Sequence, residues 1–211
     1  ARKLEKNIDA IRKQYMSDAK SSGLKEKQLG TVLYIIDHYG VRVGNDNVEL
    51  NKEKIEKGSG DELVVGASTL RVGHVNLKPD NVVNFKFLGK DSIQFDKDLK
   101  VPPEIYKNFK AFITNKNPDA KVFNLIDSTA INNYLKEFDK DFSAKVFRTR
   151  LASEIIHKAL KTVHVPEKST KASTKILFNQ ANAKVADVLN HTRNATLKST
   201  EALKKADDDL K

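Results

Sequence analysis

The sequence predicts an α+β fold that is predominantly helical and contains one small antiparallel sheet or β-hairpin. Apolar residues recur at three- and four-residue steps over most of the 211-residue chain, which is typical of amphipathic helices. In one short stretch the pattern changes to alternation: Val83, Phe85 and Phe87 are separated by polar residues, as in a strand with one buried face. The hydrophobic content of 39% is enough for one sizeable domain with a core.

Two helices are expected first. The first is predicted from four apolar residues at helical spacing, which are Leu4, Ile8, Ile11 and Tyr15. The second is predicted over residues 24–39 and should end at Gly40, since glycine tolerates the left-handed conformation that commonly terminates a helix. Residues 44–66 are rich in Gly, Asn and charge, and they predict a flexible surface loop.

Strand character begins near Ser68, and a β-hairpin is expected at residues 81–96. The alternation in its first strand stops at the turn Leu88-Gly89-Lys90-Asp91 and resumes with Ile93 and Phe95. Lys90 should therefore lie near the hairpin tip.

The remaining elements are expected to be helices. Pro102-Pro103 opens one of them, because proline suits the first helical position. Ser128 is the expected N-cap of a helix that runs to Phe138. Two further helices are predicted over 143–162 and 172–189, and residues 196–211, with few large apolar side chains, predict the start of an exposed helix.

The composition limits the classes of function. A net charge of +10 and a pI near 9.5 favour a polyanionic partner. The absence of cysteine excludes both a disulfide framework and a zinc site with Cys ligands. No apolar run approaches the ~18 residues of a membrane span. The chain begins with Ala1 and ends within a helical pattern, so we expect a piece of a longer chain.

Four cationic side chains stand in distinctive short motifs. Arg42 occurs in V-R-V-G-N-D, Lys90 in F-L-G-K-D-S, Arg148 in K-V-F-R-T and His191 in L-N-H-T-R. Arginine binds two phosphate oxygens at once, and lysine or histidine donates a proton or a hydrogen bond. Each residue also has an ordinary explanation. Arg42 and His191 follow helices, where such residues are common, Lys90 lies in a solvated turn, and Arg148 fits a surface position on a helix.

Taken together, the order and wording of these motifs resemble the core of the eukaryotic type IB DNA topoisomerases, from about Lys3 to the last helix. The resemblance implies the fold shared by tyrosine recombinases and type IB topoisomerases. It assigns residues 1–195 to the catalytic core and 196–211 to the start of a linker helix. The family's N-terminal DNA-clamping lobe and C-terminal tyrosine segment are then expected to lie outside this chain.

The resemblance also implies the chemistry. Arg42, Arg148 and His191 would stabilise a five-coordinate phosphorus, and Lys90 would donate a proton to the leaving 5′-oxygen, with neither metal nor cofactor. Arg150 departs from the family pattern, which has an aromatic residue there. The further residues expected to contact DNA are Asn45, Asp91, Ser92, Lys145, Thr149, Arg150 and Arg193.

The family's nucleophile is a tyrosine that follows the histidine after a long linker, and no tyrosine follows His191 in this chain. The expected partners are therefore duplex DNA and the tyrosine-bearing segment, either in the same chain or as a separate one. The resemblance further implies a monomer located in the nucleus and not at a membrane.

Two other interpretations stay open at this point. A tyrosine recombinase or integrase has a related fold and pocket, but its second arginine and its histidine normally belong to H-x-x-R and L-G-H motifs. A basic DNA-binding module without chemistry would give the same charge, but it predicts no cooperation among the four cations.

Overall fold

The structure, a computed structural model, describes residues 2–44, 65–90, 93–162 and 171–190. It divides into two compact units, Ala1–Arg150 and Leu151–Lys211. The α+β prediction is confirmed. The helices are α1 (Arg2–Ala19), α2 (Leu24–Tyr39), α4 (Pro103–Ile113), α5 (Ser128–Lys136), α6 (Lys145–Lys161) and α7 (Lys171–Val188). Among the described residues, no helix combines the length and apolarity that a membrane span requires.

One antiparallel sheet contains the strands β1 (Val75–Lys78), β2 (Val82–Leu88) and β3 (Gln94–Lys100), in that order. The predicted hairpin is confirmed as β2 and β3, whose register sets Phe87 opposite Phe95. The strand character that was expected from Ser68 onward is only partly present. Two short 3-10 turns, Ala67–Thr69 and Val72–His74, precede β1.

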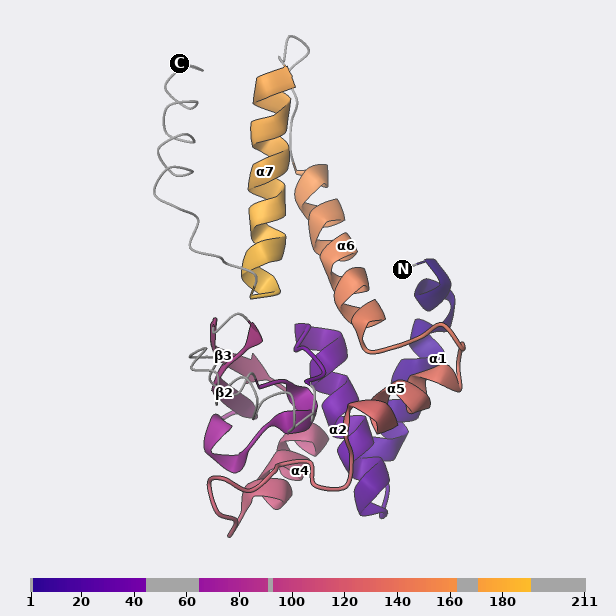
Figure 1. Cartoon of the computed structure of the whole chain (residues 1–211), viewed down its shortest axis with the longest axis vertical. Coiled ribbons are helices and arrows are strands. Elements are labelled where there is room, and N and C mark those ends of the chain that lie inside the picture. The colour runs from indigo at the N-terminus through magenta and orange to yellow at the C-terminus, as the bar shows by residue number, and fades with distance from the viewer. Residues whose placement is uncertain (1, 45–64, 91–92, 163–170, 191–211) are drawn as a thin grey trace, which may run out of the picture. The chain divides into compact units, whose positions relative to one another are not determined.

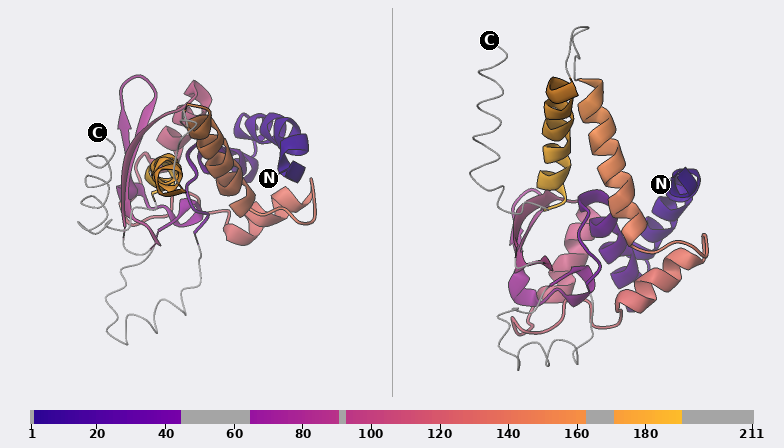
Figure 2. Two further views of the ribbon diagram at one scale, coloured as in Figure 1. Left: turned by 90° about the horizontal axis from the view of Figure 1, so that it is seen from above. Right: turned by 45° about the horizontal axis from the view of Figure 1, so that its top comes forward.

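The core of the first unit lies between the inner face of the sheet and the helices α1, α2 and α4 (Figures 1 and 2). Phe85 on β2 meets Phe109 on α4 edge to face, with ring centroids 5.3 Å apart. Phe109 in turn contacts Phe123 at 5.9 Å. These rings fix α4 against the sheet, while α2 packs against both α1 and α4.

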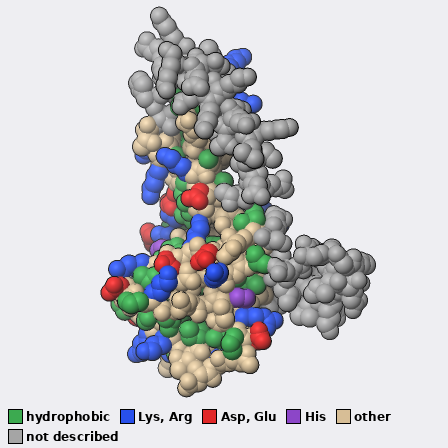
Figure 3. Space-filling model, turned by 90° about the vertical axis from the view of Figure 1, so that its left-hand side faces the viewer, with side chains coloured by type: hydrophobic (Ala, Val, Ile, Leu, Met, Phe, Trp, Pro, Cys, Tyr) green, Lys and Arg blue, Asp and Glu red, His purple; other side chains and the backbone are tan. Residues whose placement is uncertain are grey.

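The outer face of the sheet is polar, and acidic and basic side chains are mixed over this side of the first unit (Figure 3). Lys78 on β1 binds both carboxylate oxygens of Asp98 on β3 at 2.8 Å. Asn84 on β2 donates to the same carboxylate at 2.8 Å. Cross-strand pairs of this kind help to set the register of the sheet.

One helix start differs from the prediction. The N-cap of α5 is Asp127 and not Ser128, because the Asp127 carboxylate accepts a hydrogen bond of 2.7 Å from the Ala130 backbone N–H. Aspartate is an equally good cap and adds a negative charge next to the positive end of the helix dipole. The loop predicted over 44–66 and the exposed helix predicted over 196–211 lie mainly or wholly outside the described residues, as does the domain boundary at 195.

Candidate functional site

Arg42 is placed by the end of α2. Gly40 caps that helix in the left-handed conformation, with φ 62° and ψ 27°, and its N–H donates to the Ile36 carbonyl at 3.1 Å. This confirms Gly40 as the terminator. The cap turns the chain sharply, so that Arg42, two residues later, leaves the helix axis and is half-buried.

The segment that carries Arg42 is fixed by the 65–69 segment. The Arg42 carbonyl accepts a hydrogen bond of 2.7 Å from the Ala67 N–H, and the Val43 carbonyl accepts one of 2.7 Å from Ser68. The two segments approach so closely that a Cβ on Gly66 would lie 2.3 Å from the Gly44 Cα and 2.8 Å from the Arg42 carbonyl oxygen. The backbone under Arg42 therefore requires glycine at position 66.

Gly66→Ala is expected to destabilise the protein by about 1–3 kcal/mol, since the added methyl group must push two backbone segments apart. Urea unfolding of the variant measures this loss. The matched control is Gly73→Ala, whose Cβ would meet only Pro118, at an ordinary 3.4 Å. Equal midpoints for the two variants would show that the close approach at Gly66 is not needed.

Arg148 reaches the same place from the first turn of α6. Its Nη1 donates a hydrogen bond to the carbonyl oxygen of Gly40, the cap of α2. Burial, and secondarily the positive charge of Arg42, lower the pKa of Arg148 to about 10. The side chain therefore stays charged at neutral pH. Its bond to Gly40 brings it to the backbone two residues before Arg42, although the two arginines are 106 positions apart along the chain.

Lys90 is exposed in the turn after β2, as predicted. The base of this turn is closed by the Gly89 N–H, which donates to the Ile93 carbonyl at 2.9 Å. The carbonyl of Leu88 accepts a hydrogen bond of 2.9 Å from the Val65 N–H, and Val65 directly precedes the glycine that fixes the Arg42 segment. Backbone hydrogen bonds therefore connect the hairpin turn to the segment that carries Arg42.

Of the other predicted site residues, three lie in the described part of the chain and five lie outside it. Lys145 and Thr149 are exposed at the start of α6. Arg150 is buried, with a relative exposure of 9%, and its Nε lies 3.4 Å from a carboxylate oxygen of Glu5 on α1. A DNA contact by Arg150 stays a prediction, and the ion pair gives it a structural contact that was not foreseen. The predicted residues outside the described part of the chain are Asn45, Asp91, Ser92, His191 and Arg193.

Four of the five tyrosines donate hydrogen bonds to other groups of the protein, and Tyr39 is one of them, bonded to the Lys100 carbonyl. The Tyr15 hydroxyl donates to Asp37 at 2.8 Å, that of Tyr106 to the Lys78 carbonyl at 3.0 Å, and that of Tyr134 to Asp18 at 2.5 Å. Burial, reinforced by the neighbouring carboxylates, raises the pKa of Tyr15 and Tyr134 well above the ordinary value. A raised pKa disfavours the phenolate that attacks phosphorus, so both are poor nucleophiles.

A buried ionic cluster that was not expected from the sequence lies beneath the end of α2. The side chain of Asp37 is only 1% exposed and accepts hydrogen bonds from Arg12 and Tyr15 on α1. Tyr15 also lies 3.2 Å from Nε2 of His38, whose pKa is lowered chiefly by burial. The sequence contains one signal for this cluster: Asp37 directly follows the apolar run Val32–Ile36 on α2. A carboxylate next to buried residues needs a hydrogen-bond or ion-pair partner.

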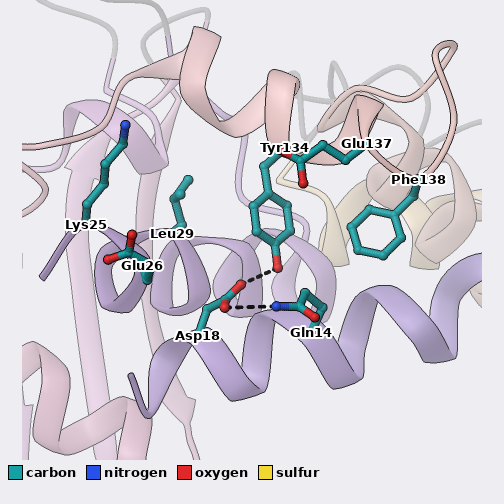
Figure 4. A pocket seen from close by; sticks show the side chains of 8 residues that line it. All are labelled: Gln14, Asp18, Lys25, Glu26, Leu29, Tyr134, Glu137 and Phe138. Atoms are coloured by element: carbon teal, nitrogen blue, oxygen red, sulfur yellow. Dashed lines mark hydrogen bonds between the residues drawn. The ribbon is translucent and has the colours of Figure 1, made fainter. Parts of the chain in front are cut away.

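A pocket of about 490 Å³ lies near the start of α2, at the opposite end of that helix from Arg42 (Figure 4). Tyr134 on α5 crosses it to reach Asp18 on α1, which also accepts a hydrogen bond from Gln14. None of the predicted site residues lines it. The lining residues are Gln14, Asp18, Lys25, Glu26, Leu29, Tyr134, Glu137 and Phe138.

Comparison with known proteins gives one consistent result. The family model for the catalytic core of eukaryotic DNA topoisomerase I matches residues 1–211. The chain is 40% identical over 200 residues to DNA topoisomerase 1 of Schizosaccharomyces pombe, covering 93% of this chain and 23% of that protein. It is 39% identical to the Homo sapiens protein of that name, covering 92% of this chain and 25% of that one. The Candida albicans protein of that name is 34% identical, covering 100% and 26%. The chain therefore spans about a quarter of the length of these relatives.

Proposed function

This chain belongs to the family of eukaryotic DNA topoisomerase I catalytic cores, and from that premise we propose that it supplies the phosphate-binding pocket of an enzyme that relaxes supercoiled duplex DNA. The enzyme cuts one strand, lets the duplex rotate and reseals the strand, with neither ATP nor metal. Membership of this family sets aside the recombinase interpretation.

The reaction follows from the charges that develop on the phosphodiester. A tyrosine phenolate, supplied by a segment outside this chain, attacks phosphorus, and the bond from phosphorus to the 5′-oxygen breaks. Lys90 gives its proton to that oxygen, and a 3′-phosphotyrosine remains. Arg42, Arg148 and His191 bind the non-bridging oxygens, on which negative charge rises in the five-coordinate transition state. Attack by the free 5′-hydroxyl reverses each step and reseals the strand.

The observation that carries this proposal is the meeting of Arg42 and Arg148 at the C-terminal end of α2. Burial is the main cause of the lowered pKa of Arg148, and the like charge of Arg42 lowers this pKa further because the two groups repel each other. A bound phosphate offsets the repulsion between the two guanidinium groups, because its negative charge attracts both of them. The arrangement of the two groups, which are held close together in the free protein, therefore favours binding of an anionic ligand.

The same premise supports the remaining assignments. We place the enzyme in the nucleus, as a monomer, with duplex DNA and the tyrosine-bearing segment as partners. His191 acts with Arg42 and Arg148, and Asn45, Asp91, Ser92 and Arg193 contact DNA. Lys145 and Thr149, exposed on the first turns of α6 three residues before and one residue after Arg148, contact the DNA backbone.

The chain alone is expected to bind duplex DNA weakly, with no sequence preference and with strong salt dependence. Each phosphate contact contributes about −0.9 to the slope of log K against log salt. Arg42→Gln should therefore make the slope less steep by about 0.9, as measured by fluorescence anisotropy between 50 and 200 mM salt.

The matched control is Lys25→Gln, which removes one exposed positive charge at the other end of α2 and should leave the slope unchanged. Binding that does not depend on salt would contradict a DNA-binding surface. Equal losses of slope in both variants would favour a diffuse basic surface, as expected of a DNA-binding module without chemistry.

A further inference from the structure

The buried carboxylate of Asp37 has a full set of partners on α1. Arg12 binds it through two hydrogen bonds, Nε to Oδ2 at 2.7 Å and Nη2 to Oδ1 at 3.1 Å, and the Tyr15 hydroxyl donates to Oδ2 at 2.8 Å. A two-point contact between a guanidinium and a carboxylate fixes orientation as well as distance. Asp37 therefore attaches the last turn of α2 to α1 in one defined position.

Two residues that matter for the pair follow Asp37 on the same stretch of backbone. Gly40, three residues later, ends the helix and offers its carbonyl to Arg148, and Arg42 follows two residues after that. Arg12, the anchor of Asp37, belongs to α1 and contributes no group to the pair of guanidiniums. The backbone between residues 37 and 42 thus connects Asp37 to the pair.

The two guanidinium groups need such an anchor. Their repulsion opposes the hydrogen bond by which Arg148 on α6 holds the Gly40 cap of α2. The segment of Arg42 is held from one side by residues 66–68. The Asp37 ion pair restrains the helix end against α1.

We propose that Asp37 is a positioning residue, which through Arg12 and Tyr15 fixes the Gly40 carbonyl and thereby aligns Arg148 with Arg42 for binding of the phosphodiester. This inference rests on the proposed function for its catalytic consequence. Its structural part, the alignment of Arg148, stands independently of any activity.

The first measurement reads the alignment directly. In the wild-type chain, the Nε–Hε resonance of Arg148 in an ¹H–¹⁵N NMR spectrum should be sharp, because the guanidinium is bonded to the Gly40 carbonyl. Asp37→Asn keeps the shape of the side chain but removes its charge. It should broaden this resonance or shift it toward that of a free arginine. Tyr15→Phe, which removes only one of the hydrogen bonds to Asp37, should have a smaller effect in the same direction and serves if Asp37→Asn does not fold.

The matched control is Gln28→Leu. Gln28 is fully buried on the same helix, near its other end, where it donates to Asn124 at 2.8 Å and accepts from the Leu125 N–H at 3.0 Å. Its loss should lower the thermal midpoint of the protein yet leave the Arg148 resonance as in the wild type. A purely structural role for Asp37 predicts instead that both variants behave alike.

The second measurement uses the full-length enzyme that contains this chain and follows single-turnover cleavage of a DNA duplex. Asp37→Asn should slow cleavage by about tenfold or more at unchanged DNA affinity, because small misplacements of reacting groups are costly. Gln28→Leu should cleave at the wild-type rate below its thermal midpoint.

An unchanged Arg148 resonance in Asp37→Asn overturns the proposal, and so does a slowing that Gln28→Leu matches. Should the wild-type enzyme not cleave DNA at all, the proposed function fails, and the NMR comparison alone still decides whether Asp37 positions Arg148.

Discussion

Replacing Arg148 by alanine is expected to slow DNA strand cleavage by about two or more orders of magnitude and to leave the affinity for duplex DNA almost unchanged. The guanidinium is already bonded to the Gly40 carbonyl in the free protein. The interaction of Arg148 with phosphate is therefore expected to be strongest in the transition state, when the non-bridging oxygens carry additional negative charge. Single-turnover cleavage of a labelled duplex measures the rate, and the salt-dependent binding assay measures the affinity.

Arg71→Ala is the matched control for this prediction. Arg71 also donates from Nη1 to a backbone carbonyl, that of Asp119 at 2.6 Å, but it is exposed and lies outside the cation pair. Its loss should leave the cleavage rate as it is. A cleavage rate for Arg148→Ala within a few-fold of that of the control would show that Arg148 takes no part in the reaction. A loss of DNA affinity as large as the loss of cleavage rate would show that Arg148 serves in binding only.

The second large effect is a switch between no activity and activity. The 211-residue chain alone should not relax a supercoiled plasmid, and addition of a tyrosine-bearing segment of the family, fused or as a separate chain, should restore relaxation without ATP or metal. In the family, the phenolate that accepts the phosphoryl group belongs to a tyrosine after the histidine, and no tyrosine follows His191 in this chain. Gel electrophoresis of plasmid topoisomers measures relaxation, and the trapped intermediate should carry DNA through its 3′ end on the added segment.

Two outcomes would contradict this expectation. Relaxation by the chain alone that is abolished by Tyr134→Phe would identify an internal nucleophile, in spite of the hydrogen bond from Tyr134 to Asp18. A segment with phenylalanine in place of its tyrosine should restore nothing. Restoration by that control segment would show that the added chain acts by stabilising the fold.

The sequence was sufficient where local patterns decide the structure. Alternating Val83, Phe85 and Phe87 identified the hairpin, and the helical spacing of apolar residues identified the helices, because both patterns reflect burial of one face. Gly40 as a terminator follows from its tolerance of positive φ. The local sequence could not show whether Asp127 or Ser128 caps α5. Both residues are good caps, and the backbone geometry selects between them.

Contacts across long stretches of chain were not predictable from patterns alone. The resemblance to a family assigned roles to Arg42 and Arg148, but nothing in their local sequence indicates that Arg148 bonds to the cap of α2. The need for glycine at position 66 is equally non-local, because it arises from the approach of Gly44. The role of Asp37 was not predicted for the same reason, because its partners Arg12 and Tyr15 lie on another helix.

The hydrogen bond between Arg148 and Gly40 joins residues that are 108 positions apart, and this separation determines when the pair can form during synthesis. Ribosomes add about 5–20 residues each second, so α2 emerges several seconds before α6. Until then a nascent chain contains Arg42 without its partner. Order of synthesis thus delays assembly of the cation pair until the first unit is complete.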